Sequence, residues 1–105
     1  MVRCDNINVS GATVTGLNAA NGAQVFAASA NADDCERPIQ ALTGGEVRIA
    51  NGTCINSASQ NRVLTGGIIF AQNLTTNAGT PSVADFAGSP TFNTWDTNGV
   101  IYANV

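Results

Sequence analysis

The sequence predicts an all-β protein, a small antiparallel β-sandwich or flattened barrel with two Asn-Gly hairpins and a long loop over residues 73–93. Asn, Gly and Ser, which favour turns, separate short runs rich in Thr, Val and Ile, which favour strands. No segment repeats its apolar residues at the helical period. Two Asn-Gly pairs each lie between extended runs, an arrangement typical of tight hairpins.

The N-terminal part of the chain alternates short strand signals with turn residues. Strands are expected over residues 7–9, 12–17, 25–28 and 38–42. A turn is expected at Asn21-Gly22, and the fourth run ends at Gly44-Gly45. The best helical candidate, residues 27–32, is too short to form a helix on its own.

The clearest hairpin signal is the run from Glu46 to Ser57 with Asn51-Gly52 at its centre. A two-residue turn of type I′ needs a positive φ at both central residues, which Asn and Gly tolerate. This turn would place Ile49 opposite Cys54, and the two side chains would point into the core.

A second hairpin is expected where Asn98-Gly99 separates residues 94–97 from residues 100–103. Its register would place Trp95 opposite Tyr102. The two rings then either cover the small core or form an aromatic contact patch for a partner or a sugar.

One internal repeat suggests a different architecture. Leu64-Thr-Gly-Gly67 repeats Leu42-Thr-Gly-Gly45 at an offset of 22, and strand signals follow both copies. A fixed period of this length is typical of a β-solenoid. The next spacing, from Gly67 to Gly99, is longer, and no third full copy exists. Two antiparallel strands entered through similar turns are therefore the preferred interpretation.

Composition excludes most catalytic classes. The 105 residues contain neither Lys nor His, four Arg, and seven Asp or Glu, for a net charge of −3. Without His there is no Ser-His-Asp triad or Cys-His pair, and without Lys there is no Schiff base. Four scattered Arg do not make the basic face that nucleic acids need. We therefore expect no enzyme, no catalytic residues, no nucleic-acid partner and no cofactor.

The cysteines and the N-terminus indicate a compartment. Cys4, Cys35 and Cys54 lack metal-site spacing, and their disulfide or thiol state is left open, with reduced thiols preferred. The chain opens with no apolar signal segment, and no apolar run is long enough to span a membrane. Synthesis in a cytoplasm and no membrane partner are expected.

Residues 33–37 form the only charge cluster of the sequence. Asp33, Asp34 and Glu36 offer oxygen ligands for Ca²⁺, but they lack EF-hand spacing. Adjacent carboxylates in a loop are usually solvated, so no metal site is predicted. A pair of carboxylates for sugar hydrolysis is not indicated either.

Several segments resemble small β-sandwich proteins and modules of tailed bacteriophages. These commonly carry A-N-x-x-R, I-Q-N, V-x-I-G-x-G, L-x-x-G-G and G-x-I-Y-A patterns. The matching segments of this chain are residues 28–31 with 37–40, residues 45–52, residues 64–67 and residues 99–103. The resemblance spans roughly residues 22–72 and 99–103, about half of the chain.

The resemblance implies a virion structural role, most simply a capsid decoration (cement) protein that binds the assembled head in many copies. Its partners would be the major capsid protein or another virion protein and copies of itself, at the capsid surface. The domain would span residues 1–105, with residues 1–5 as an N-terminal arm or a frayed end. Predicted partner contacts are Val2, Arg3, Val83, Phe86, Phe92 and Trp95.

Two other functions stay open at this point. One is a glycan-binding module on a surface or fibre, with Trp95 or Tyr102 as the stacking platform. The other is a subunit of an extracellular filament completed by strand exchange.

Overall fold

A computed structural model describes residues 1–88 and 90–103. Residue 89 of the predicted loop and residues 104 and 105 of the predicted domain lie outside the described residues. The described elements are β1 (Val2–Arg3), β2 (Thr15–Ala20), β3 (Gln24–Ala28), β4 (Arg37–Leu42), β5 (Glu46–Ala50), β6 (Thr53–Cys54), β7 (Asn61–Leu64), β8 (Ile68–Gln72), β9 (Thr75–Thr76), the 3-10 helix η1 (Val83–Asp85), β10 (Phe86–Ala87), β11 (Thr91–Phe92) and β12 (Val100–Ala103).

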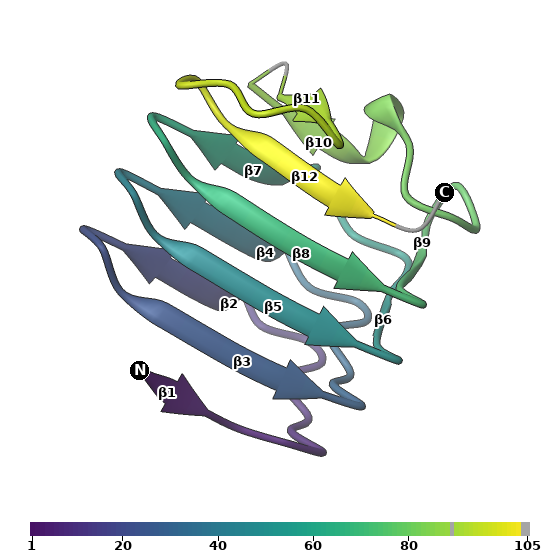
Figure 1. The fold of residues 1–105 in the computed structure, drawn as a ribbon. Helices are drawn as coiled ribbons and strands as arrows, with labels where there is room; N and C mark the ends of the chain where they lie inside the picture. The colour runs from purple at the N-terminus through teal and green to yellow at the C-terminus, as the bar shows by residue number, and fades with distance from the viewer. Residues whose placement is uncertain (89, 104–105) are drawn as a thin grey trace.

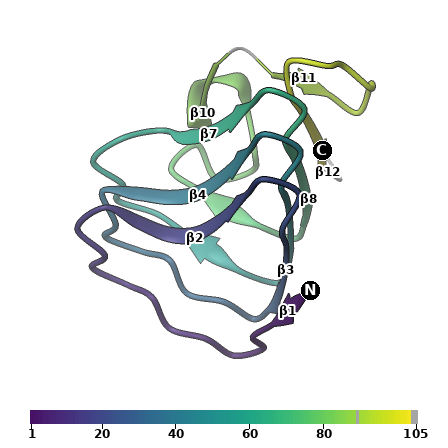
Figure 2. The ribbon, with the colours of Figure 1, turned by 90° about the vertical axis from the view of Figure 1, so that its left-hand side faces the viewer.

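The chain is all-β, as predicted, but it forms a β-solenoid and not an antiparallel sandwich or barrel. Every pairing between these strands is parallel. The sheets have the orders β1-β3-β5-β8-β12-β11, β10-β7-β4-β2 and β6-β9. Figures 1 and 2 show the strands of successive coils stacked one above another, with the larger two sheets on different sides of the coil.

The offset that separates the two Leu-Thr-Gly-Gly motifs is the length of one coil. Val25 lies opposite Val47, and Val47 lies opposite Ile69. Leu17 and Ile39 pair at the same offset on the other large sheet. Each coil therefore places equivalent residues in contact, which is the physical reason for the repeat.

The first predicted hairpin is wrong, because Asn51-Gly52 is a corner of the coil. Asn51 has the left-handed φ of 54° that the prediction required, but Gly52 does not adopt a positive φ. β5 consequently pairs with β3 and β8, while β6 pairs with β9. Left-handed residues stack at this corner in successive coils, namely Asn6, Ser29, Asn51 and Asn73.

The second predicted hairpin is also wrong. β12 pairs in parallel with β8 and β11, so Tyr102 lies opposite Phe70 and not opposite Trp95. Asn98 does not have a positive φ, whereas Gly99 has a φ of 149°. The Asn-Gly pair therefore forms a corner of the coil that leads into β12, and it does not connect two antiparallel strands.

The Thr-Gly-Gly motif has a distinct role for each residue. Thr65 and Gly66 adopt left-handed φ values of 53° and 77°, which turn the chain between β7 and β8. Gly67 needs no special φ, but a Cβ there would lie 2.1 Å from the carbonyl oxygen of Ala41 in the preceding coil. The same close approach occurs between Gly45 and Ala19. The second glycine is therefore required by stacking.

The core fills the inside of the coil with small and branched side chains. Buried positions alternate with outward positions along β5 and β8, as expected for strands with one face inside. Burying an aliphatic side chain completely contributes roughly 1.5–3 kcal/mol. The largest fully buried aliphatic side chains are those of Ile39, Ile49, Ile69, Ile101, Val47, Val63 and Val100.

The predicted 73–93 loop contains short ordered elements rather than one structureless connection. β9, η1, β10 and β11 all begin within it. Ile69 and its strand partner Ile101 are separated by more residues along the chain than paired residues of earlier coils, because this coil carries an insertion. Buried Asp85 organises the insertion by accepting hydrogen bonds from the Thr76 hydroxyl (2.8 Å) and the Ser82 N–H (2.9 Å).

Candidate functional site

A single row of large side chains crosses the outer face of the sheet that contains β3, β5 and β8. Neighbouring residues of these strands, such as Val47 and Ile49 on β5, are buried, so the residue between them points outward. Parallel pairing without offset then brings equivalent outward residues side by side. We call this row the ladder; it consists of Arg3, Phe26, Arg48, Phe70 and Tyr102.

Within the ladder, Phe26, Arg48, Phe70 and Tyr102 pack on one another through their flat faces. The Arg48 guanidinium carbon lies 5.0 Å from the ring centroid of Phe26 and 4.3 Å from that of Phe70. Phe70 and Tyr102 stack with centroids 5.1 Å apart and planes inclined by 19°. Cation–π and aromatic contacts of this kind fix the orientation of the side chains as well as stabilising the sheet.

A groove of about 590 Å³ runs beside the ladder. Small side chains, Ala28 and Ala50, line it next to Phe26 and Arg48. Its polar lining includes Asp5, Gln72 and Asn93. The groove therefore combines half-buried aromatic rings with amide, guanidinium and carboxylate groups along a surface that spans several strands.

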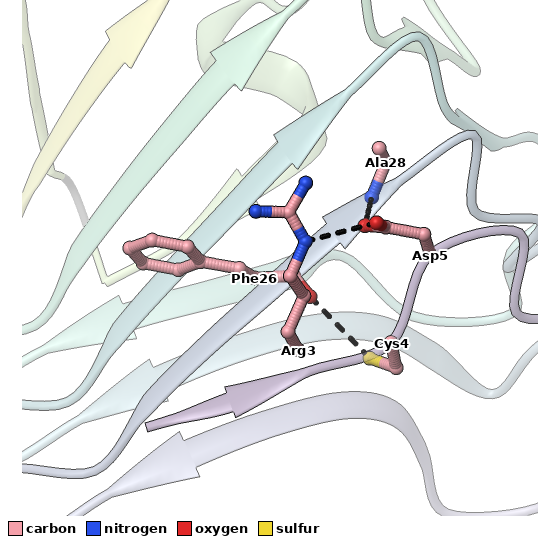
Figure 3. A network of polar contacts seen from close by, with 5 residues as sticks. All are labelled: Arg3, Cys4, Asp5, Phe26 and Ala28. Atoms are coloured by element: carbon pink, nitrogen blue, oxygen red, sulfur yellow. Dashed lines mark hydrogen bonds and ion pairs between the residues drawn. The ribbon is translucent and has the colours of Figure 1, made fainter.

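Two ion pairs hold the arginines of the ladder. Arg3 Nε lies 2.9 Å from Asp5 Oδ2, and Arg48 Nε lies 3.0 Å from Glu46 Oε2. Asp5 also accepts a hydrogen bond from the Ala28 N–H at 3.2 Å, as Figure 3 shows. The hydrogen bond from Arg3, reinforced by that from Ala28, lowers the pKa of Asp5 below its usual value, so this carboxylate is ionised near neutral pH.

The ion pairs leave the outer edge of each guanidinium unoccupied by described residues. Both pairs use Nε, and no described residue accepts a hydrogen bond from the Nη atoms of Arg3 or Arg48. The Arg48 side chain is 49% exposed, whereas that of Glu46 is only 13% exposed. The surface of the groove thus presents cationic donors more openly than the carboxylates that hold them.

The predicted partner contacts do not form one patch. Val2 and Arg3 lie in β1, which pairs with β3 and so belongs to the sheet. Phe86 is buried and packs edge-on against half-buried Phe92, with ring centroids 5.7 Å apart. Val83 and Trp95 are exposed in the inserted region. Of the six residues, only Arg3 is part of the described lining of the groove.

The acidic segment at residues 33–36 serves the coil in this structure. Asp33 accepts a hydrogen bond from the Ile55 N–H (3.0 Å), and Glu36 accepts one from the Ser59 hydroxyl (2.8 Å). Within residues 1–88 and 90–103, no three His, Cys, Asp or Glu side chains gather in a way that would hold a metal ion.

The three cysteines are free thiols. Cys35 and Cys54 are buried, and Cys4 is half-buried. Burial raises the pKa of Cys54 to about 12, an effect that the Asn61 amide opposes by donating a hydrogen bond to the sulfur. These positions indicate packing roles rather than nucleophilic chemistry.

A second hollow of about 350 Å³ lies under the insertion and is lined by Asn61, Asn77 and Asp85, among others. Asp85 Oδ2 already accepts two hydrogen bonds there, and Oδ1 accepts one from the Ala78 N–H at 3.3 Å. This hollow is explained by the folding of the insertion, so the groove is the stronger candidate site.

Sequence reasoning identified Arg3 and Tyr102 but missed the three residues between them. The interval from Phe26 to Arg48 equals that from Arg48 to Phe70, and both equal the offset of the Leu-Thr-Gly-Gly repeat. Extending that period to the whole sequence would have placed them in one row. The assumed antiparallel pairing removed this signal, because it places residues one period apart on unrelated strands.

Comparison with protein-family models, with curated proteins and with solved structures gave no match. Among the described residues, no helix has the length and apolar character needed to cross a membrane.

Proposed function

We propose that this protein is a non-catalytic binding module whose groove holds an extended glycan. The observation that carries the proposal is the ladder, with aromatic rings and Arg48 in contact and a groove alongside. The glycan chain would run across the strands, along the axis of the solenoid. Successive sugars would then meet equivalent positions of successive coils.

The chemistry of the groove suits sugars. A pyranose ring has an apolar C–H face, which stacks on an aromatic ring, and a rim of hydroxyl groups, which needs hydrogen-bond partners. Phe26 and Tyr102, at the two ends of the stacked part of the ladder, supply the rings, and Phe70 between Arg48 and Tyr102 holds the stack in place. Gln72 and Asn93 supply amides that both donate and accept.

The same groove is poorly equipped for glycan cleavage. Glycoside hydrolysis generally needs two carboxyl groups that flank the scissile bond, about 5–9.5 Å apart. The described lining of the groove contains one carboxylate, Asp5, which is held by Arg3 and by the Ala28 N–H. Binding without turnover is therefore the proposed activity.

The test is glycan binding by Phe70→Ala measured by calorimetry, with Trp95→Ala as the matched aromatic control. Ligands come from a panel of neutral and acidic linear oligosaccharides. Phe70→Ala should weaken the best ligand of the unmodified protein by at least about tenfold, or roughly 1.4 kcal/mol. Trp95, which is 58% exposed but lies outside the described groove lining, should be dispensable.

Each opposite result has a clear meaning. Loss of binding in Trp95→Ala with normal binding in Phe70→Ala would move the site to the insertion. Absence of binding across the panel would overturn the proposal. Far-ultraviolet circular dichroism and the thermal midpoint of each variant separate loss of the site from loss of the fold.

Capsid decoration is a second proposal, supported by the phage resemblance and by exposed apolar residues at opposite parts of the chain, Val2 and Val83. The β-sandwich fold that accompanied the resemblance is not the fold of this chain. A virion location and a glycan-binding groove are compatible with each other. Deleting residues 1–5 should reduce occupancy on assembled shells, and unchanged occupancy would contradict the contribution of β1.

A further inference from the structure

We infer, building on the proposed function, that the glycan is acidic and carries a carboxylate on every second sugar. The two arginines of the ladder alternate with aromatic rings in the order Arg3, Phe26, Arg48, Phe70. They lie two strand spacings apart along the sheet, which corresponds to about 9.6 Å between their backbones. A linear glycan with the same alternation meets both cations while its other sugars lie beside the rings.

The state of the local carboxylates supports an anionic ligand. Asp5 and Glu46 direct their oxygens at the Nε atoms of the arginines, and Asp5 also accepts the Ala28 N–H. This arrangement fixes each guanidinium and leaves its two Nη groups as a pair of parallel donors. A carboxylate is the acceptor that fits this pair in bidentate geometry.

The arginines of the ladder are more exposed than the carboxylates that hold them. The side chains of Arg3 and Arg48 are 66% and 49% exposed, against 38% for Asp5 and 13% for Glu46. A ligand that approaches the ladder therefore meets the guanidinium groups first. The net charge of the whole chain is −3, so attraction to an acidic glycan comes from these groups at short range and not from the overall charge.

The experiment compares three glycans that carry a uronate on every second sugar with their carboxyl-reduced, neutral forms. Decasaccharides of hyaluronan, unsulfated chondroitin and heparosan serve as the acidic probes. Neutral oligomers of glucose, galactose, mannose and N-acetylglucosamine complete the panel. Affinities are measured by calorimetry at two salt concentrations.

At least one uronate decasaccharide should bind about tenfold or more tightly than its reduced form, because each bidentate contact to a charged group is lost on reduction. Its affinity should fall as salt rises. Arg3→Gln and Arg48→Gln should each remove most of this difference. Arg62→Gln, on β7 and outside the described groove lining, should leave it unchanged.

Arg3→Gln separates loss of binding from loss of the fold, because this substitution should disturb the fold little. Arg3 packs on no described ring, and its one ion pair among the described residues is with the exposed Asp5. Equal affinity for acidic and reduced forms, or binding of neutral glycans alone, would overturn the acidic inference and leave glycan binding intact. No binding to any member of the panel would overturn both.

Discussion

Arg48 makes the densest set of contacts in the ladder, because its guanidinium lies between the rings of Phe26 and Phe70 while Glu46 holds its Nε. A cation–π contact at an exposed site contributes about 0.5–1 kcal/mol. Two such contacts on one side chain make Arg48 a structural member of the sheet as well as a candidate ligand contact.

Arg48→Gln should lower the free energy of unfolding by about 1 kcal/mol, since the amide cannot replace the cation over either ring. Urea denaturation measures this loss. Arg62→Gln is the matched control, because Arg62 has no ring contact among the described residues. Equal stability of the unmodified protein and Arg48→Gln would show that the ring contacts add nothing.

Cys54 makes the free energy of unfolding fall as the pH becomes alkaline. Burial raises the pKa of this thiol from 9.0 to about 12, so the folded protein holds a proton that the unfolded chain releases. Its contribution to stability is complete below pH 9.0 and is lost as pH rises from there towards about 12. The slope approaches about 1.4 kcal/mol per pH unit for one proton.

This dependence is measured by urea denaturation between pH 8 and pH 11. Cys54→Ala should be less stable at pH 8, because it leaves a void, yet it should show a shallower decline with pH. The difference between the two profiles isolates Cys54 from tyrosine and the other thiols. Parallel profiles would contradict the assignment of this proton to Cys54.

At the scale of the element, the corner between β7 and β8 decides how closely two coils approach. A Cβ on Gly67 would lie 2.1 Å from the Ala41 carbonyl oxygen and 2.7 Å from its carbon. Backbone atoms on the opposing coil cannot rotate away as the end of a flexible side chain can. The close approach therefore sets the spacing of the coils at this corner.

Gly67→Ala should cost about 2–3 kcal/mol in the free energy of unfolding, because the coils must separate to admit the methyl group. Gly22→Ala is the matched control: Gly22 has a φ of 77° but no atom within 4 Å of the added Cβ. Its cost should be about 1–2 kcal/mol, from the left-handed conformation alone. A smaller cost for Gly67→Ala than for Gly22→Ala would contradict the stacking argument.

Local sequence signals located most strands but did not determine their partners. Residues 46–50 and 100–103 were expected to be extended, and both are strands, β5 and β12. The Asn51-Gly52 pair predicted a turn, yet a hairpin turn and a coil corner use the same residue type at positive φ. Only the long-range repeat interval distinguishes the two, and the insertion before β12 lengthened its last copy.

The candidate site could be predicted only in part, because the repeat interval that aligns its residues was not extended to the whole sequence. Trp95 and Tyr102 were recognised as aromatic candidates, but their partners depended on the pairing of strands. In the parallel solenoid Tyr102 stacks on Phe70, while Trp95 lies in the insertion. The ladder is a property of register, so it emerges only when the coils are aligned.

At the scale of the whole molecule, Figure 1 shows β3, β5, β8 and β12 side by side on one face of the solenoid, with β10 and β11 of the insertion near one end. Each coil adds one position to the ladder, and neighbouring coils hold it in line. Such a surface suits a linear polymer better than a compact ligand, because its contacts repeat along one axis.

The most direct test of glycan recognition by the ladder is backbone amide chemical-shift mapping by NMR during titration with the best glycan of the panel. If the ladder binds the glycan, shifts should concentrate on the outward positions of β3, β5, β8 and β12, with β2, β4 and β7 little changed. Shifts confined to residues 77–99, or no shifts at saturating glycan, would contradict it.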